Sequence, residues 1–383
     1  MSLSDSPLVC ETETQHGNWR RWLLLIALVY LMLLAVSMIG SGFKLAAGDQ
    51  AKTLFTFASN PIMGLIIGMV ATALIQSSST VTSIIVGMVA GGLPITIAVP
   101  MMMGANIGTS ITNTLVSLGH VARKDEFQRA FNAATIHDFF NVMSVFIFLP
   151  LEMAFGILEH TSAFVVSMLN AGGTMGVDGF NPIKALTQPA LNIVTGMVSG
   201  LPSVYPGIAK IILGIGLIVT SITYMGKIMK SLMVGKAKDI LHKSIGKGPI
   251  SGISSGALMT VLVQSSSTTT SLVVPLVGSG ILKAKDIYPF TLGANIGTCI
   301  TALIAALGVV GGNAGVALQI AMVHLLYNVF SVVLIYGTPM LRDIPLDLSY
   351  KLSVIVAEKK FYGVAYIGGL FFCMPLGIIF ISV

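Results

Sequence analysis

Two polar segments of identical sequence interrupt otherwise apolar stretches of the chain. Residues 76–80 and 264–268 both read Gln-Ser-Ser-Ser-Thr. Hydroxyl and amide side chains donate and accept hydrogen bonds. A helix that begins at such a segment adds free backbone N–H groups and the positive end of its dipole, which suits phosphate and other oxyanions. The alternative is a polar patch that only joins membrane helices.

The anion would meet only neutral donors at these segments, because no Lys or Arg precedes Lys283 in either surrounding apolar stretch. Burying a divalent anion without compensation is very costly. Bound cations could neutralise it, and the two ligands would then bind cooperatively. The residue types therefore indicate an anion taken up together with cations. The candidate anion ligands are Gln76, Ser77, Ser78, Ser79, Gln264, Ser265, Ser266 and Ser267.

A second repeated motif, Gly-Ala-Asn-Ile-Gly-Thr, occupies residues 104–109 and 293–298. Its glycines permit unwinding and close approach of helices. Unwound carbonyls together with side-chain oxygens would form a shell for sodium, a hard cation that prefers oxygen ligands. The alternative is a kink at a tightly packed glycine. The candidate sodium ligands are Asn106, Thr109, Ser110, Asn295, Thr298 and Thr301, with Thr112 as a further oxygen.

A third pair of motifs places a histidine and an asparagine one helical turn apart, at His137 and Asn141 and again at His324 and Asn328. Residues at this spacing share one helix face. We interpret them as interhelical hydrogen-bonding groups, with a proton relay as the weaker alternative.

Asp138 lies beside the first of these histidines, in a predicted membrane helix. An acid in a membrane helix is a functional candidate by default, so we expect Asp138 to help bind a cation. The alternative is an ion pair with Arg123 or Arg129 near the start of the helix.

Composition indicates a membrane protein, because 54% of the 383 residues are hydrophobic and only 9% are charged. Soluble domains carry about 25% charged residues. The net charge of +6 sits between apolar spans, which fits the positive-inside rule and argues against nucleic-acid binding. Five stretches exceed the roughly 18 apolar residues of a membrane helix. They are Trp22–Phe43, Gly207–Gly226, Ile287–Leu307, Gly315–Pro339 and Tyr362–Val383.

Processing signals and covalent links are not indicated. The first apolar stretch is longer than a signal-peptide core and no A-x-A-like cleavage site follows it, so we expect it to remain as a membrane helix. The three cysteines, at positions 10, 299 and 373, show neither a disulfide framework nor metal-ligand spacing. The sequence contains no N-glycosylation acceptor.

The three motifs recur in the same order, 187 to 189 residues later, which defines an internal repeat. Residues 61–75 would span about 22 Å as a helix, short of the roughly 30 Å hydrocarbon core. We therefore predict a re-entrant hairpin with Gln-Ser-Ser-Ser-Thr at its tip. Arg20 and Arg21 place the N-terminus in the cytoplasm, and the charge rule then inserts the second hairpin from the opposite side.

The predicted fold is an all-α polytopic membrane protein with two inverted repeats, each with a re-entrant helical hairpin and a discontinuous transmembrane helix. The predicted parts are a cytoplasmic N-terminal segment 1–21, repeat 1 over 22–153 with hairpin 61–93, an external connecting segment 154–204, repeat 2 over 205–340 with hairpin 250–282, and a C-terminal segment 341–383 with a final membrane helix.

The paired motifs resemble the type II sodium-dependent phosphate cotransporter family, over most of residues 61–153 and 250–345 and including Arg129–Asn141. The resemblance implies that both hairpin tips form the phosphate site. It also implies sodium ligands among Gln264, Ser265, Thr298 and Thr301. Asp138 stands where charge-moving members have Asp and electroneutral members have Gly, which implies an electrogenic cycle.

Animal members of this family carry a large glycosylated, disulfide-linked outer loop. Residues 152–204 are short and contain neither cysteine nor an acceptor sequon, so the role of that loop does not transfer. The compact termini suggest a bacterial member in the inner, or plasma, membrane.

The expected function is therefore symport of sodium and inorganic phosphate across a lipid bilayer, with no further cofactor and no nucleic-acid partner, and with the oligomeric state left open. The alternatives are a symporter of another small anion (sulfate, arsenate or a carboxylate), a channel, and an intramembrane enzyme. Gly252-x-Ser254-x-Gly256 formally fits G-x-S-x-G, but repeat 1 lacks the serine and the motif needs a strand-to-helix turn.

Overall fold

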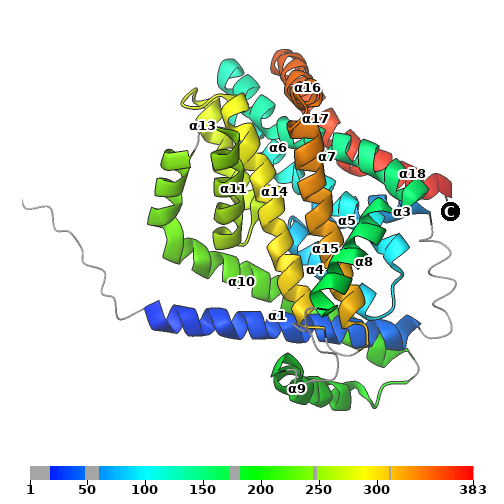
Figure 1. The fold of residues 1–383 in the computed structure, drawn as a ribbon. Helices are drawn as coiled ribbons and strands as arrows, with labels where there is room; N and C mark the ends of the chain where they lie inside the picture. Colours follow the sequence, from blue (N-terminus) through cyan, green and yellow to red (C-terminus); the bar gives the residue numbers. More distant parts are fainter. Residues whose placement is uncertain are drawn as a thin grey trace, which may run out of the picture.

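The computed structural model describes residues 18–47, 60–171, 182–202, 204–244, 248–309 and 312–382, and the regular structure in these ranges is helical (Figure 1). Most of the predicted N-terminal segment, including Cys10, lies outside the described residues.

The described helices of the first half begin with the apolar span and run through the hairpin to two helices after the third motif. They are α1 (Asn18–Ala47), α3 (Pro61–Ile75), α4 (Ser78–Ala90), α5 (Ile95–Thr109), α6 (Ile111–Ser117), the short 3₁₀ turn η3 (Leu118–His120), α7 (Lys124–Phe155), α8 (Ile157–Ala171) and α9 (Pro182–Val198).

The second half repeats this order and adds a C-terminal group. Its helices are α10 (Tyr205–Ser244), α11 (Pro249–Val263), α12 (Ser266–Ser271), α13 (Val274–Gly278), α14 (Ala284–Leu307), α15 (Ala314–Ser331), the π-helical turn η4 (Val332–Tyr336), α16 (Pro339–Glu358), α17 (Phe361–Gly368), a second π-helical turn η5 (Gly369–Cys373) and α18 (Met374–Ser382).

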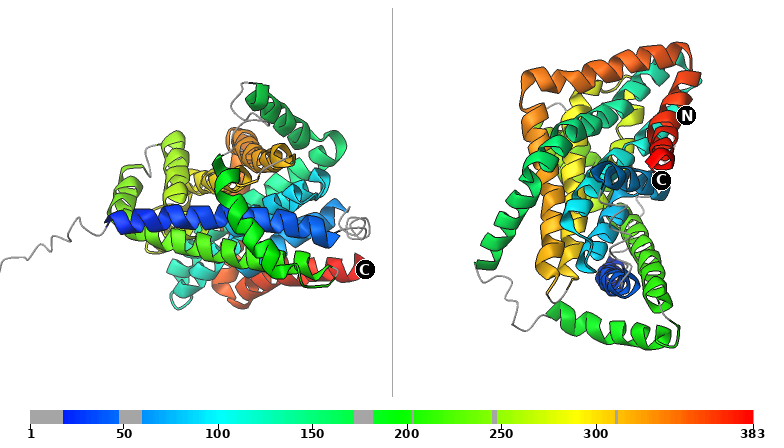
Figure 2. Two further views of the ribbon diagram at one scale, coloured as in Figure 1. Left: turned by 90° about the horizontal axis from the view of Figure 1, so that it is seen from below. Right: turned by 90° about the vertical axis from the view of Figure 1, so that its right-hand side faces the viewer.

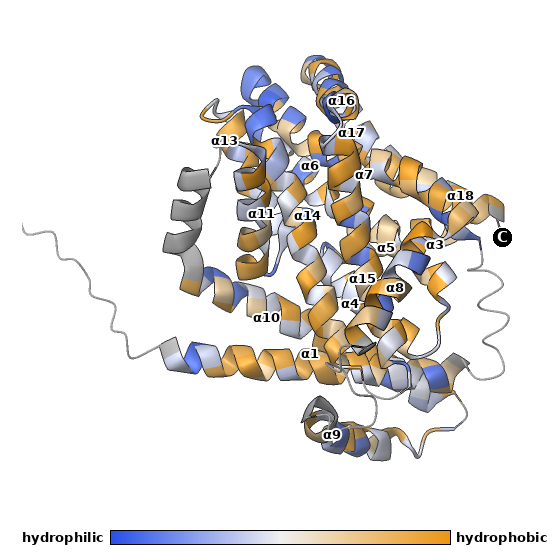
Figure 3. Cartoon of the chain, viewed as in Figure 1, coloured by the Kyte–Doolittle hydropathy of each residue, from blue (hydrophilic) through white to orange (hydrophobic). Residues whose placement is uncertain are grey.

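Seven helical segments of the described chain are long and apolar enough to cross a membrane, by length and composition. Apolar residues dominate α1 and α11 in Figure 3. The prediction of an all-α polytopic membrane protein is confirmed at this level. The segments are Trp19–Ala46, Ile95–His120, Lys124–Phe155, Tyr205–Leu232, Ala284–Leu307, Ala314–Tyr336 and Phe361–Ile381.

Helices α3 and α11 are too short to cross. Each has 15 residues, about 22 Å at 1.5 Å per residue, against a roughly 30 Å hydrocarbon core. Each starts with proline, at Pro61 or Pro249, whose missing N–H costs nothing at the first helical position. Each ends at the glutamine that begins the polar segment, Gln76 or Gln264.

Glycines let α3 pack on α5, and α11 on α14, with the two helix backbones in direct contact. A Cβ atom at Gly68 would lie 2.0 Å from the Met101 carbonyl oxygen, and one at Gly104 would lie 1.9 Å from that of Leu65. Both contacts recur in repeat 2, where Gly256 meets the Phe290 carbonyl and Gly293 meets that of Ile253, each at 1.9 Å. Residue numbers rise together along each pair, so the paired helices run parallel.

The predicted unwinding of Gly-Ala-Asn-Ile-Gly-Thr is wrong. Helix α5 remains helical through Thr109, and α14 is continuous from Ala284 to Leu307. Only repeat 1 has a break, at Ser110 between α5 and α6, where the Ser110 hydroxyl donates to the Ile107 carbonyl at 2.8 Å and competes with the helical ladder. Cys299 holds the equivalent position in repeat 2, and its weaker thiol donor leaves the ladder intact. The predicted discontinuous helix is therefore correct for repeat 1 alone.

The first apolar span of each repeat packs on that of the other. Helices α1 and α10 run side by side in opposite directions (Figures 1 and 2). A Cβ atom at Gly42 would lie 2.7 Å from the Gly207 carbonyl oxygen, and one at Gly214 would lie 2.9 Å from that of Ala35. The equivalent first spans of the two repeats thus contact each other directly.

The last helices pack on the outside of α7 (Figure 1). Helix α16 packs along α7, and α17 follows it back toward α7, where the Tyr366 ring meets Phe131 and Phe139 at centroid distances of 6.2 and 6.3 Å. The C-terminal segment thus contributes Ile367 and Phe371 to the hydrophobic core, while Phe361, Phe380 and Ile381 are exposed.

We predict that Gly104→Ala lowers the thermal unfolding temperature in detergent. The new methyl group would overlap the Leu65 carbonyl, and overpacking costs about 1–3 kcal/mol. Gly216→Ala is the matched control, since a Cβ atom there meets nothing within 4 Å in the interior of α10. It should be neutral or stabilising by up to about 1 kcal/mol. Equal unfolding temperatures for the two variants would contradict the close helix packing.

Candidate functional site

The two polar segments adopt the same backbone reversal. Gln76 and Gln264 have φ angles of 58° and 56°, and among the described residues they are the only non-glycine residues with positive φ. Left-handed backbone in a residue other than glycine is uncommon and clusters at functional sites. The following serines, Ser77 and Ser265, are extended, and their hydroxyls accept the N–H groups of the next helix at 3.3 and 3.1 Å. Each segment is thus a helix end joined directly to a helix start.

Four serine hydroxyls at these starts have no acceptor within the described part of the chain. They belong to Ser78, Ser79, Ser266 and Ser267, which are only 2–7% exposed, and none donates a hydrogen bond to a described residue. Polar groups that are nearly buried are normally paired. The two tips therefore present donors that the protein itself leaves unused.

The glutamine side chains fix the position of each tip. The Thr112 hydroxyl donates to Gln76 Oε1 at 2.8 Å, and the equivalent Thr301 donates to Gln264 Oε1 at 3.2 Å. Each threonine lies 17 residues after the start of its membrane-capable segment, Ile95 or Ala284. The tips thus meet the interior of these segments and not their ends.

The two tips differ in exposure. Gln264 is only 9% exposed, whereas Gln76 is exposed. The surroundings of the two glutamines therefore differ, although the serines at the following helix starts are nearly buried at both tips.

Helix α6 connects the first tip, the second hairpin and Asp138 through three consecutive residues. Thr112 bonds Gln76 as described above. Asn113 Oδ1 accepts from the Thr270 hydroxyl at 2.7 Å, and Thr114 Oγ1 donates to Asp138 Oδ2 at 3.0 Å. Consecutive helical residues point about 100° apart, so three successive side chains can reach three elements. Sequence reasoning missed Asn113 and Thr114, although a polar run within an apolar span was the available signal.

The histidine and asparagine motif of each repeat clamps the Gly-Ala-Asn asparagine of the other repeat. Asn295 Oδ1 lies 2.7 Å from His137 Nε2, and Asn295 Nδ2 donates to Asn141 Oδ1 at 2.8 Å. The reciprocal contacts join Asn106 Oδ1 to His324 Nε2 at 3.1 Å and Asn106 Nδ2 to Asn328 Oδ1 at 2.8 Å. These six side chains are at most 3% exposed. The prediction of interhelical hydrogen bonding is confirmed.

The candidate sodium ligands lie in different settings. Both amide atoms of Asn106 and of Asn295 are engaged in the clamp. The hydroxyls of Thr109 and Thr298 donate to carbonyls four residues earlier in their own helices, which leaves oxygen lone pairs as acceptors. Thr301 lies at the second tip, with Gln264 and Ser265 beside it.

Asp138 is fully buried, and its two carboxylate oxygens differ. Oδ2 accepts from Thr114 and from the Tyr366 hydroxyl at 3.1 Å, while Oδ1 has no hydrogen-bond partner among the described residues. A buried carboxylate oxygen without a partner suits a cation ligand. Sequence reasoning missed Tyr366, because nothing in the pattern of α17 distinguishes it.

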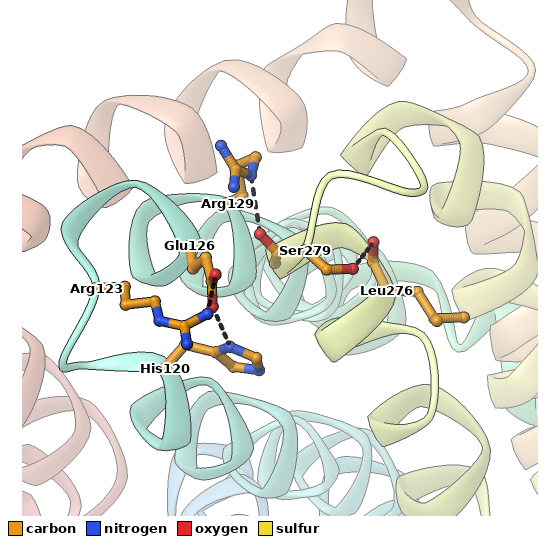
Figure 4. A network of polar contacts seen from close by, with 7 residues as sticks. His120, Arg123, Glu126, Arg129, Leu276 and Ser279 are labelled. Atoms are coloured by element: carbon orange, nitrogen blue, oxygen red, sulfur yellow. Dashed lines mark hydrogen bonds and ion pairs between the residues drawn. The ribbon is translucent and has the colours of Figure 1, made fainter.

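The predicted alternative, an ion pair of Asp138 with Arg123 or Arg129, is wrong. Arg123 pairs with Glu126 at 2.6 Å, and Arg129 Nε donates to the Gly278 carbonyl at 2.9 Å (Figure 4). Arg129 thereby ties α7 to the end of the second hairpin. Asp138 is left with hydroxyl donors only.

Groups of three or more His, Cys, Asp or Glu side chains that could hold a metal ion are absent from the described ranges.

Comparison with known proteins identifies close relatives. The model of the Na+/Pi-cotransporter family matches residues 31–169 and 217–344. The sodium-dependent phosphate transport protein 2A of Ovis aries is 32% identical over 425 aligned residues, which cover 92% of this chain and 66% of the relative. The 2B protein of Homo sapiens is 30% identical, over 94% of this chain and 65% of the relative. The chain thus spans just under two thirds of the length of these relatives. No solved structure matches it.

We predict that Asn295→Ala and His137→Ala each destabilise the protein and that their effects are strongly coupled. Removing one partner leaves buried polar groups unpaired, at about 1–3 kcal/mol for each group. A double-mutant cycle on thermal unfolding in detergent should give a coupling energy of about 0.5–3 kcal/mol. The control cycle pairs Asn295→Ala with His120→Ala, since His120 bonds Glu126 and lies outside the clamp. Additive effects of Asn295 and His137 would contradict the reciprocal contact.

Proposed function

The chain belongs to the Na+/Pi-cotransporter family, and from this membership we propose that it is a secondary active symporter that couples inward sodium flow to uptake of inorganic phosphate. The observation that supports this most directly is the pair of matching tips with nearly buried serine hydroxyls that donate to no described residue. Such donors suit an oxyanion that enters and leaves. The proposed location is the cell membrane, the inner membrane in a bacterium.

We propose that the two repeats are inserted in opposite directions, each with a re-entrant hairpin. Parallel packing of α3 on α5 starts both helices at one side, while the tip reaches only Thr112, in the interior of the longer segment. The same holds for α11, α14 and Thr301. Reciprocal contacts between equivalent residues support a two-fold axis. An axis in the membrane plane would place the site near the midplane.

The proposed phosphate ligands are the side chains and first-turn N–H groups of both tips. Hydroxyls of Ser78, Ser79, Ser266 and Ser267 would donate to the phosphate oxygens, and Ser77 and Ser265 hold the local backbone. Gln76 and Gln264 position the tips on α6 and α14. All these donors are neutral, so phosphate binding alone would leave its charge uncompensated.

Sodium is the proposed source of that compensation. One ion would use Asp138 Oδ1 with neighbouring oxygens of α6, including Ser110, which lies beside the carboxylate. A second would lie near Gln264, Ser265, Thr298 and Thr301 at the second tip. The Thr109 hydroxyl oxygen and the side-chain amide oxygens of Asn106 and Asn295 complete the proposed set of sodium ligands. Because Asp138 adds one negative charge, the cycle is proposed to carry more sodium charge than phosphate charge and to be electrogenic.

We predict that Ser78→Ala and Ser266→Ala weaken sodium-dependent phosphate uptake in proteoliposomes while leaving thermal stability unchanged. These hydroxyls donate to no described protein group, so only the ligand should lose a bond. A hydrogen bond to a charged group is worth about 1.5–3 kcal/mol, which corresponds to a rise of roughly 10- to 100-fold in KM. Ser279→Ala, at an exposed serine after the same second hairpin, is the control.

Unaltered uptake kinetics in well-folded Ser78→Ala and Ser266→Ala would reject the tips as the phosphate site. In the same assay, sulfate, arsenate and small carboxylates are offered as competitors at equal concentration. Full uptake of one of them in place of phosphate would assign the chain to that anion.

We predict that Tyr366→Phe raises the sodium concentration for half-maximal uptake several-fold, because it removes a hydrogen bond to Asp138, while the charge moved per phosphate stays the same. Asp138→Gly should instead reduce the charge moved per phosphate. Both are measured as phosphate-induced current against radiolabelled flux. Tyr362→Phe, at a partly exposed tyrosine on the same helix, should change neither quantity. Equal sodium dependence of Tyr366→Phe and the unmodified protein would remove Tyr366 from the site.

A further inference from the structure

A cavity of about 310 Å³ lies at the base of the second hairpin, away from both tips. It is lined by the starts of α11 and α14 and by residues of η4 and α16, including Gly248, Lys285, Asp286, Tyr288, Arg342 and Asp343. None of these belongs to the proposed transport site. The volume is at the small end of ligand pockets, which suits a small ion with water.

Several donors face this cavity. Lys285 and Arg342 carry positive charge, and the Arg342 guanidinium lies 5.7 Å from the centroid of the Tyr336 ring, which helps to hold it in place. Helix α11 begins beside the cavity, directly after Gly248, which places the positive end of its dipole there.

Tyr288 is the independent sign of a ligand. Its side chain is 1% exposed, and its hydroxyl has no hydrogen-bond partner in the described part of the chain. The ring is fixed by edge contacts with Phe140 and Tyr336, at centroid distances of 6.1 and 5.2 Å. A buried hydroxyl that is held rigidly but left unpaired lacks a partner that a bound molecule would supply.

The lining also contains two carboxylates, Asp286 and Asp343. Arg342 Nε and Asp343 Oδ1 are 3.7 Å apart and both side chains are well exposed, so this contact is a weak ion pair and leaves both groups available. Two cations beside two carboxylates favour an oxyanion that still carries a proton. The cations bind its oxygens and a carboxylate accepts its O–H, whereas a fully deprotonated anion such as sulfate is repelled by the carboxylate.

We propose that this cavity is a second anion site, which binds hydrogen phosphate in the absence of sodium. The contrast with the hairpin tips is one of charge. The tips offer only neutral donors, so a bound anion there needs bound cations. In this cavity the side chains of Lys285 and Arg342 supply the positive charge. A role for this site in phosphate transport rests on the proposed function, but phosphate binding to the site does not.

The test is equilibrium dialysis of the purified full chain with radiolabelled phosphate in sodium-free choline buffer. One equivalent of phosphate should bind, and Lys285→Gln and Arg342→Gln should each weaken binding at least tenfold. Lys351→Gln is the matched control, because it removes an exposed charge of α16 outside the cavity. Ser266→Ala should leave this sodium-free binding unchanged.

Two further variants test the chemistry without removing a cation. Asp343→Asn removes one of the repelling carboxylates, so it should strengthen sulfate binding and lower the preference for phosphate over sulfate several-fold. Tyr288→Phe removes a hydroxyl that no described protein group uses, so thermal stability without phosphate should stay unchanged while phosphate affinity falls several-fold. A purely structural role for Tyr288 would instead lower the thermal stability of Tyr288→Phe and leave its phosphate affinity unchanged.

The proposal is overturned if no phosphate binds without sodium, if the unmodified protein binds sulfate as tightly, or if Lys285→Gln and Arg342→Gln bind phosphate normally. Should the charge variants aggregate on size exclusion, Asp343→Asn and Tyr288→Phe decide the question. Loss of sodium-driven uptake with sodium-free binding intact would reject the proposed transport function and leave this site standing. Sodium-driven uptake without any sodium-free binding would reject this site alone.

Discussion

A bilayer offers no water to the buried amides of Asn106 and Asn295, so each must find its partners inside the protein. Each finds them in the opposite repeat, on a histidine and an asparagine one helical turn apart. Helix α5 is thereby tied to α15, and α14 to α7. Separating either pair would leave several buried polar groups unpaired at once. These four helices therefore behave as one unit that neither repeat could form alone.

Close backbone packing places the proposed ligand-binding groups on that unit. Because Gly68 and Gly104 have no side chain, α3 lies against α5, and Gln76, which follows α3, reaches Thr112. The same arrangement in repeat 2 brings Gln264 to Thr301. Three consecutive residues of helix α6 then make one hydrogen bond each to a different element. Thr112 bonds the first tip, Asn113 the second hairpin, and Thr114 Asp138. A break of one residue at Ser110 sets the direction of this short helix, and so sets which side chains can meet.

Charge distinguishes the two regions that suit anions. The hairpin tips are rich in donors and contain no cationic side chain, so an anion bound there, as proposed, would need partner cations to offset its charge. The cavity at the base of the second hairpin carries Lys285 and Arg342 with two carboxylates, and it needs no added cation. One chain thus combines a site suited to coupled binding with a site suited to uncoupled binding of related ligands.

Sequence alone was sufficient for the membrane class, the repeated motifs and the short lengths of α3 and α11, because these depend on composition, periodicity and spacing. It also indicated the hydrogen-bonding role of His137 and His324, but not their partners. The unbroken α14, the partners of Arg123 and Arg129, and the contacts of Asn113, Thr114 and Tyr366 were decided by tertiary structure. These depend on which helices lie side by side. Packing brings together residues that are far apart in the sequence, such as Asp138 and Tyr366, which are 228 positions apart. No local sequence pattern contains that information.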